Sequence, residues 1–122
     1  MGLLGHLVEI AKASQVDVTI DLPHIPSLAG VQETIKAGIF STLGPQNVRV
    51  RRAIRNLETV AQAPLYPLLF DPQTSGGLLA SAPARHATVC LATLQALGYN
   101  RATIIGAVQP LASPGEPILL CV

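Results

Sequence analysis

The chain divides at the polar segment Asp71-Pro72-Gln73-Thr74-Ser75-Gly76-Gly77, which separates the apolar residues 65–70 from the apolar residues 78–82. Proline and glycine end regular structure, so this segment is predicted to be a turn. It brings backbone N–H groups, two hydroxyls, an amide and a carboxylate together, and such a set of groups suits an anion. Ordinary turn chemistry between a helix and a strand explains the same residues, and both interpretations stay open.

Regular structure is predicted on both sides of this turn. Before it, Pro64 stands at a first-turn position, and the apolar residues after it predict a short helix that ends at Asp71-Pro72. After it, residues 77–82 read as a buried strand. Pro83 then opens a helix that ends at Gly98. Cys90, inside this helix, is expected to be a reduced core residue, and Cys121 is also expected to be reduced.

The N-terminal part alternates between the helix period and the strand period. Apolar residues at helical spacing predict an amphipathic helix over residues 2–14, and the alternation at 16–20 predicts a half-buried strand. Two prolines make residues 22–27 an extended connection. Ser27 is the expected N-cap of a short helix with Gly38 as its stop, and a loop follows at 41–45.

The remaining pattern completes a mixed fold. Residues 47–62 are ambiguous, since 48–51 suit a strand and the apolar residues at 54, 57 and 60 suit a helix. Strands are predicted at 103–108 and 118–122, joined by a connection rich in proline, serine and glycine. The fold class is therefore α+β, with helices packed on a mixed or antiparallel sheet.

Length and composition limit the kinds of protein this chain can be. Its 122 residues form one domain, 1–122, with a single core. Hydrophobic residues make up 49% and charged residues 12%, so some apolar surface is expected to meet another domain or subunit. No apolar run approaches the roughly 20 residues of a membrane span, and no secretory signal is recognised. A cytoplasmic protein without a membrane partner is expected.

The one dense basic run is Arg49-Val50-Arg51-Arg52, followed by Arg55. Nucleic acid is not the expected partner, because the net charge is only +1 and aromatic residues make up 3%. A solvated face, or a rim that attracts a phosphate-bearing ligand, explains the run better. His6, His24 and His86 are far apart in sequence, so no metal site is predicted.

Two motifs resemble the C-terminal domain of the selenophosphate synthetase (selenide, water dikinase) family, of the aminoimidazole ribonucleotide synthetase-like superfamily. They are Gly2-Leu3-Leu4-Gly5-His6 and the segment from Asp71 to Leu79, and they occur in the expected order. The resemblance covers roughly residues 2–108. It implies the C-terminal-domain fold of that superfamily and a role in making selenophosphate from selenide and ATP with Mg²⁺.

The resemblance also implies that this chain is one part of a larger two-domain, homodimeric enzyme. In the family, the metal-binding aspartates and the catalytic Cys or selenocysteine and Lys belong mainly to an N-terminal ATP-binding domain, which is missing here. The chain is therefore expected to hold no catalytic or metal-binding residue and to bind neither ATP nor Mg²⁺ tightly by itself. Isolated, it is expected to be inactive.

The expected role of this domain is to complete the edge of the nucleotide and phosphate cleft. The candidate residues are Gly2, Gly5, Asn47, Thr74, Ser75, Gly76 and Gly77. Simpler explanations stand beside this role: Gly2 and Gly5 allow close helix packing, and Asn47 stabilises a turn. Asp71, which precedes the other candidates in the polar segment, is expected to cap its own loop. At the level of function, a related ATP-dependent enzyme of the aminoimidazole ribonucleotide synthetase or thiamine-monophosphate kinase groups, or a free-standing interaction module, stays open.

Overall fold

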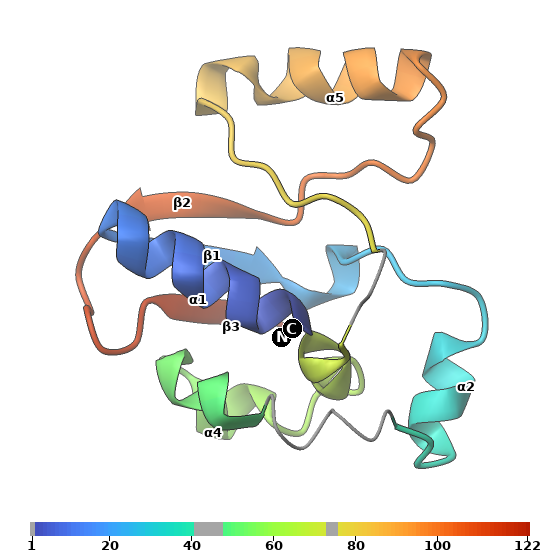
Figure 1. Ribbon diagram of the computed structural model, residues 1–122, viewed down its shortest axis with the longest axis vertical. Coiled ribbons are helices and arrows are strands. Elements are labelled where there is room, and N and C mark those ends of the chain that lie inside the picture. The colour runs from blue at the N-terminus through green and yellow to red at the C-terminus, as the bar shows by residue number, and fades with distance from the viewer. Residues whose placement is uncertain (1, 41–47, 73–75) are drawn as a thin grey trace.

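A small mixed sheet with short helices around it forms the fold. The computed structural model describes residues 2–40, 48–72 and 76–122 (Figure 1). Its elements, with η marking 3-10 helices, are α1 (Gly2–Ser14), β1 (Val16–Asp21), η1 (Leu22–His24), α2 (Val31–Lys36), η2 (Val48–Ala53), α4 (Leu57–Val60), η3 (Tyr66–Phe70), η4 (Ala84–His86), α5 (Ala87–Ala96), β2 (Gly106–Pro110) and β3 (Ile118–Cys121).

The sheet has the strand order β2-β1-β3. β1 pairs antiparallel with β2, placing Val18 opposite Val108, and parallel with β3, placing Val18 opposite Ile118. Ile54 forms a parallel bridge to Ile118, which extends pairing beyond β3. The predicted α+β class with a mixed sheet is therefore confirmed.

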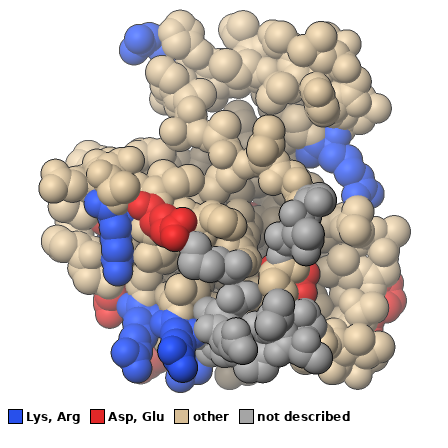
Figure 2. All heavy atoms as spheres, in the orientation of Figure 1, with Lys and Arg blue, Asp and Glu red and all other residues tan. Residues whose placement is uncertain are grey.

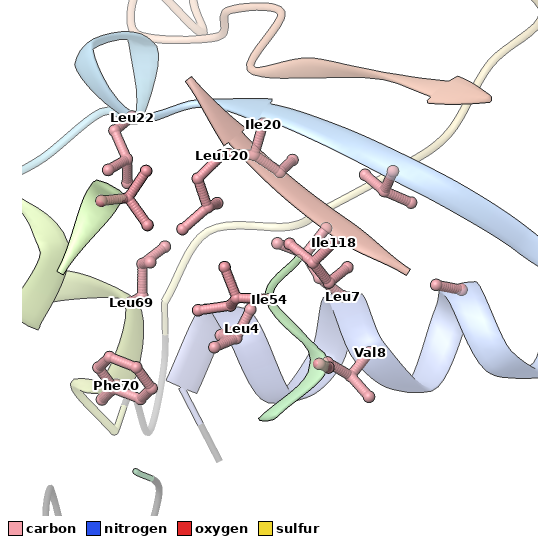
Figure 3. Packing of buried hydrophobic residues seen from close by; sticks show 14 of the residues in the cluster. Leu4, Leu7, Val8, Ile20, Leu22, Ile54, Leu69, Phe70, Ile118 and Leu120 are labelled. Atoms are coloured by element: carbon pink, nitrogen blue, oxygen red, sulfur yellow. The ribbon is translucent and has the colours of Figure 1, made fainter. Parts of the chain in front are cut away.

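The core lies between α1 and the sheet, and α1 crosses in front of the strands in Figure 1. The buried face of the helix carries Leu4, Leu7, Val8 and Ala11 at the predicted helical spacing. Apolar side chains from β1, η1, β3, the Ile54 bridge and η3 complete the cluster (Figure 3); they include Ile20, Leu22, Ile54, Leu69, Phe70, Ile118 and Leu120.

The helix at 2–14 and the strand at 16–20 are confirmed, with β1 reaching Asp21. The extended connection predicted at 22–27 is wrong at its start, since Pro23 lies in the first turn of η1, where its fixed φ suits a helix. Ser27 is not the N-cap of α2. Gly30 holds that place with φ +87°, and the predicted stop, Gly38, has φ +73°.

Of the ambiguous residues 47–62, 48–53 and 57–60 are helical, so a strand at 48–51 is wrong, and Ile54 forms a bridge rather than part of a helix. Residues 48–51 lie in η2, and α4 follows after the bridge at Ile54. The short helix before the polar turn is confirmed as η3, but Pro67 rather than Pro64 stands in its first turn. The loop predicted at 41–45 lies outside the described residues.

The strand predicted at 77–82 is wrong. These residues have no strand partner in the described structure, and the side chain of Leu78 is fully exposed. A strand forms only when a neighbouring strand accepts its backbone hydrogen bonds, and β2 pairs with β1. At the C-terminal side, β3 is confirmed, whereas β2 begins three residues later than predicted.

Helix α5 stands apart from the sheet at the top of Figure 1. It follows η4 directly and ends before Gly98, whose φ is +102°, so the predicted helix is confirmed. None of its residues is buried, and Cys90 is exposed, which corrects the prediction of a core cysteine. Helical periodicity shows which side chains share a face, but a partner surface is needed to bury them. Among the described residues, no helix is long and apolar enough to cross a bilayer.

Candidate functional site

The N-terminus of α1 packs directly against the end of η3. Gly2 is buried with φ +69°, a conformation that favours glycine. A Cβ added to Gly2 would lie 2.8 Å from the carbonyl oxygen of Leu69 and 3.2 Å from that of Asp71. The lack of a side chain at Gly2 therefore lets the first motif touch the backbone that enters the polar turn.

The residues before the polar turn are fixed by core packing. Phe70 is only 5% exposed, and its ring meets that of Tyr66 edge to face, with centroids 5.0 Å apart. The backbone N–H of Asp71 donates to the Leu68 carbonyl oxygen at 3.2 Å, which closes the last turn of η3. On the far side of the turn, Leu79 packs partly against the core. The turn is thus held at both ends.

Of the seven predicted cleft residues, the structure describes four. Gly2 and Gly5 are buried in α1, which supports a packing role for both. Gly76 and Gly77 are exposed, and a Cβ added to Gly77 would meet nothing within 4 Å. Asn47, Thr74 and Ser75 lie outside the described residues. The structure therefore brings Gly2 to the start of the turn and leaves the two glycines at its end exposed.

An ion pair joins the first half of β1 to the residue pair that follows the Ala53 end of η2. The side chain of Asp17 is 5% exposed, and its Oδ2 accepts a hydrogen bond from the Arg55 guanidinium. The same oxygen accepts from the backbone N–H of Ala112 at 3.1 Å, whereas Oδ1 has no partner in the described structure. Sequence reasoning missed this pair. Asp17 and Arg55 lie 38 positions apart in the sequence, and nothing in the residues around either one indicates that the Arg55 guanidinium reaches the Asp17 carboxylate.

Asn56 adds a second tie to the same part of the sheet. Its amide Nδ2 donates to the Leu120 carbonyl at 2.7 Å, and its Oδ1 accepts from the Leu120 N–H at 3.1 Å. Both hydrogen-bonding groups of one strand residue are therefore satisfied by one side chain. Together with the Ile54 bridge, this holds the segment after η2 against β3.

No group of three or more His, Cys, Asp or Glu side chains that could hold a metal ion occurs in the described ranges. His6 is exposed, and its Nδ1 lies 3.8 Å from Glu9 Oε2. His24 Nδ1 lies 3.1 Å from Asp21 Oδ2. Each is a local pair of side chains three residues apart in the sequence.

Residues 1–114 match the family described as AIR synthase related protein, C-terminal domain. The chain belongs to this family. Curated relatives of this chain carry the name selenide, water dikinase. The protein of Myxococcus xanthus (strain DK1622) is 39% identical over 119 residues, which cover 97% of this chain and 33% of the relative. That of Clostridioides difficile (strain 630) is 36% identical over 113 residues, covering 89% and 31% respectively.

A third relative, from Burkholderia orbicola (strain MC0-3), is 38% identical over 109 residues, with 86% of this chain and 30% of the relative covered. This family member therefore spans about a third of the length of these relatives, and it corresponds to their C-terminal part. The resemblance recognised from the two motifs is confirmed.

Because Gly2 lies so close to the backbone of η3, adding a methyl group at this position is expected to destabilise the fold. Gly2→Ala is expected to lower the free energy of unfolding by about 1–2 kcal/mol, because the φ of Gly2 disfavours alanine and the new Cβ meets the Leu69 carbonyl. Urea unfolding followed by circular dichroism measures this change. Gly77→Ala is the control, since its Cβ would enter open space; equal losses in both variants would contradict the packing role of Gly2.

Proposed function

We propose that this chain is the C-terminal domain of a selenophosphate synthetase, the enzyme that makes selenophosphate from selenide and ATP. The observation that carries this proposal is the closeness of Gly2 to the backbone at Leu69 and Asp71, which brings together two motifs that are far apart in the sequence. The names of the relatives support the same reaction. In the proposed enzyme, this contact forms one wall of the nucleotide cleft.

The residues of this chain fit a phosphate better than a metal. Exposed Gly76 and Gly77 let a ligand approach the backbone, and N–H groups in such a turn donate to phosphate oxygens. The Phe70 side chain, packed in the core, holds the start of the turn in place. Mg²⁺ would neutralise phosphate charge during phosphoryl transfer, but the described residues do not form a cluster that would hold it.

The proposed partner is an N-terminal ATP-binding domain, supplied by the remaining two thirds of a chain such as the relatives have. We further place the complete enzyme in the cytoplasm as a homodimer. Exposed apolar side chains support an additional protein contact; they include Leu28, Ile39, Phe40, Leu78, Val89, Leu97 and Ile104. A free-standing interaction module would use the same surface, so activity has to be measured to separate the two.

Exchange of domains tests the proposed function. A chimaera in which this chain replaces the matching C-terminal third of the Myxococcus xanthus relative is expected to form selenophosphate from selenide and ATP. The 122-residue chain alone is expected to form none, because it spans only a third of such enzymes. Phosphorus NMR, which detects the selenophosphate formed and the ATP consumed, measures the reaction.

A second chimaera carries the Gly2→Ala change, which is expected to disturb the wall of the cleft and to lower selenophosphate formation. Circular dichroism and thermal unfolding of each chimaera establish that it is folded before activity is compared. A folded chimaera without activity would contradict the proposed function and favour the interaction module. Activity of the isolated chain would contradict its dependence on a second domain.

A further inference from the structure

Three arginines form an exposed basic patch on η2. Arg49, Arg51 and Arg52 lie at the surface, whereas Ala53 is buried. A 3-10 helix has three residues per turn, so side chains three positions apart lie one above the other. Arg49 and Arg52 therefore share one side of η2, about 6 Å apart along its axis.

The segment that carries this patch is anchored at its C-terminal end. Ile54 bridges to Ile118, and the backbone N–H of Arg55 donates to the Ile118 carbonyl at 2.7 Å. The guanidinium of Arg55 is bound by buried Asp17, so its charge is already neutralised. The backbone next to the patch is thus held in place, which lowers the conformational entropy lost when the patch binds a ligand.

The positive charges of the three patch arginines are not neutralised by a described acidic residue. Within the described ranges, no ion pair or side-chain hydrogen bond joins any of them to an acidic residue. Blue side chains gather along the lower edge of the face in Figure 2, where the green part of the ribbon lies in Figure 1. A concentration of like charge on a small domain with net charge +1 raises the local concentration of anions at this part of the surface.

The patch lies close to the element that leads into the polar turn. α1 contacts both η2 and η3. Burial raises the pKa of Tyr66 in η3, and the positive charge of Arg51 acts in the opposite direction and lowers it. Arg51 is therefore within electrostatic range of η3, which ends at Asp71.

We infer that Arg49 and Arg52 bind the polyphosphate tail of a nucleotide, with Arg51 adding to the attraction. Guanidinium groups donate two parallel hydrogen bonds to phosphate oxygens, and two of them on one side of a helix match a chain of adjacent phosphates better than a single phosphate. The inference rests on the proposed function, which supplies the nucleotide. Nucleic acid is the less favoured occupant because aromatic residues for stacking bases make up only 3% of the chain.

Binding of inorganic triphosphate to the 122-residue chain tests this inference. Isothermal titration calorimetry and amide NMR shifts are expected to show saturable binding, with the shifts concentrated at residues 49–55. Arg49→Gln together with Arg52→Gln is expected to weaken binding about tenfold or more. The charge-matched control, Lys36→Gln with Arg85→Gln, removes two exposed cations elsewhere and is expected to change binding less than about twofold.

Competition identifies the source of the phosphates. ATP is expected to displace triphosphate, and AMP is expected to do so much more weakly. Equal weakening by the two double variants, absence of saturable binding, failure of ATP to compete, or tighter binding of a single-stranded oligonucleotide would each overturn the inference. An inactive but folded domain chimaera that still binds triphosphate would count against the proposed function alone, so the two failures are distinguishable.

Discussion

Replacing Gly106 by alanine is expected to lower the free energy of unfolding by at least about 3 kcal/mol. A Cβ at this position would lie 2.0 Å from the backbone carbonyl oxygen of Thr19 and 3.0 Å from Ile20 Cδ1. The clash is with the backbone of the central strand, so no rotamer change relieves it. β2 would have to shift away from β1, which would weaken the register that places Gly106 opposite Ile20.

Thermal unfolding measures this effect, and a fall in Tm of roughly 10 °C or more corresponds to the expected loss for a domain of this size. Gly115→Ala is the matched control, since its added Cβ meets nothing within 4 Å and its Tm is expected to stay nearly unchanged. Similar Tm values for the Gly106 variant and the parent would show that β2 does not pair closely with β1 at this position.

Replacing Arg55 by alanine is expected to cost about 2–3 kcal/mol of unfolding free energy. The carboxylate of Asp17, 5% exposed, would then lose its charged partner, and only the Ala112 N–H would remain bound to Oδ2. Removing one member of a buried pair leaves an uncompensated charge, which is the costly case. The expected value lies below that for a fully buried pair because the Arg55 side chain is 33% exposed.

Urea unfolding of Arg55→Ala and of Arg52→Ala separates this role from a general effect of removing positive charge. Arg52 is exposed, so its substitution is expected to change stability by less than about 0.5 kcal/mol. A double-mutant cycle with Asp17→Ala isolates the interaction energy of the pair. A coupling energy near zero would mean that the pair contributes little to folding.

The local hydrophobic pattern was sufficient to predict the secondary structure of elements that bury one face against the core. The helix at 2–14 and the strand that follows were predictable because periods of 3.6 and 2 specify which side chains meet the interior. Gly38 and Gly98 were predictable as the ends of helices because glycine readily adopts a positive φ, and both residues do so in the structure. In these cases, the determining interactions lie within a few residues of one another.

Predictions failed where a distant partner decides the structure. Residues 77–82 have the composition of a buried strand, but β2 pairs with β1 and those residues are left without a strand partner in the described structure. Cys90 sits among apolar residues on α5, but none of that helix is buried. The ion pair that Arg55 forms with Asp17, after the end of η2, likewise cannot be seen in a run of basic residues.

The sequence by itself determined the family, through two short motifs, and the periodicity of α1 and β1. Only the tertiary structure decided that Gly2 lies against Leu69 and Asp71. It also decided that a buried carboxylate pairs with Arg55, whereas Arg49, Arg51 and Arg52 have no carboxylate partner in the described structure. Motifs and periods are properties of neighbouring residues, whereas close backbone contacts and ion pairs join segments that only the folded chain brings together.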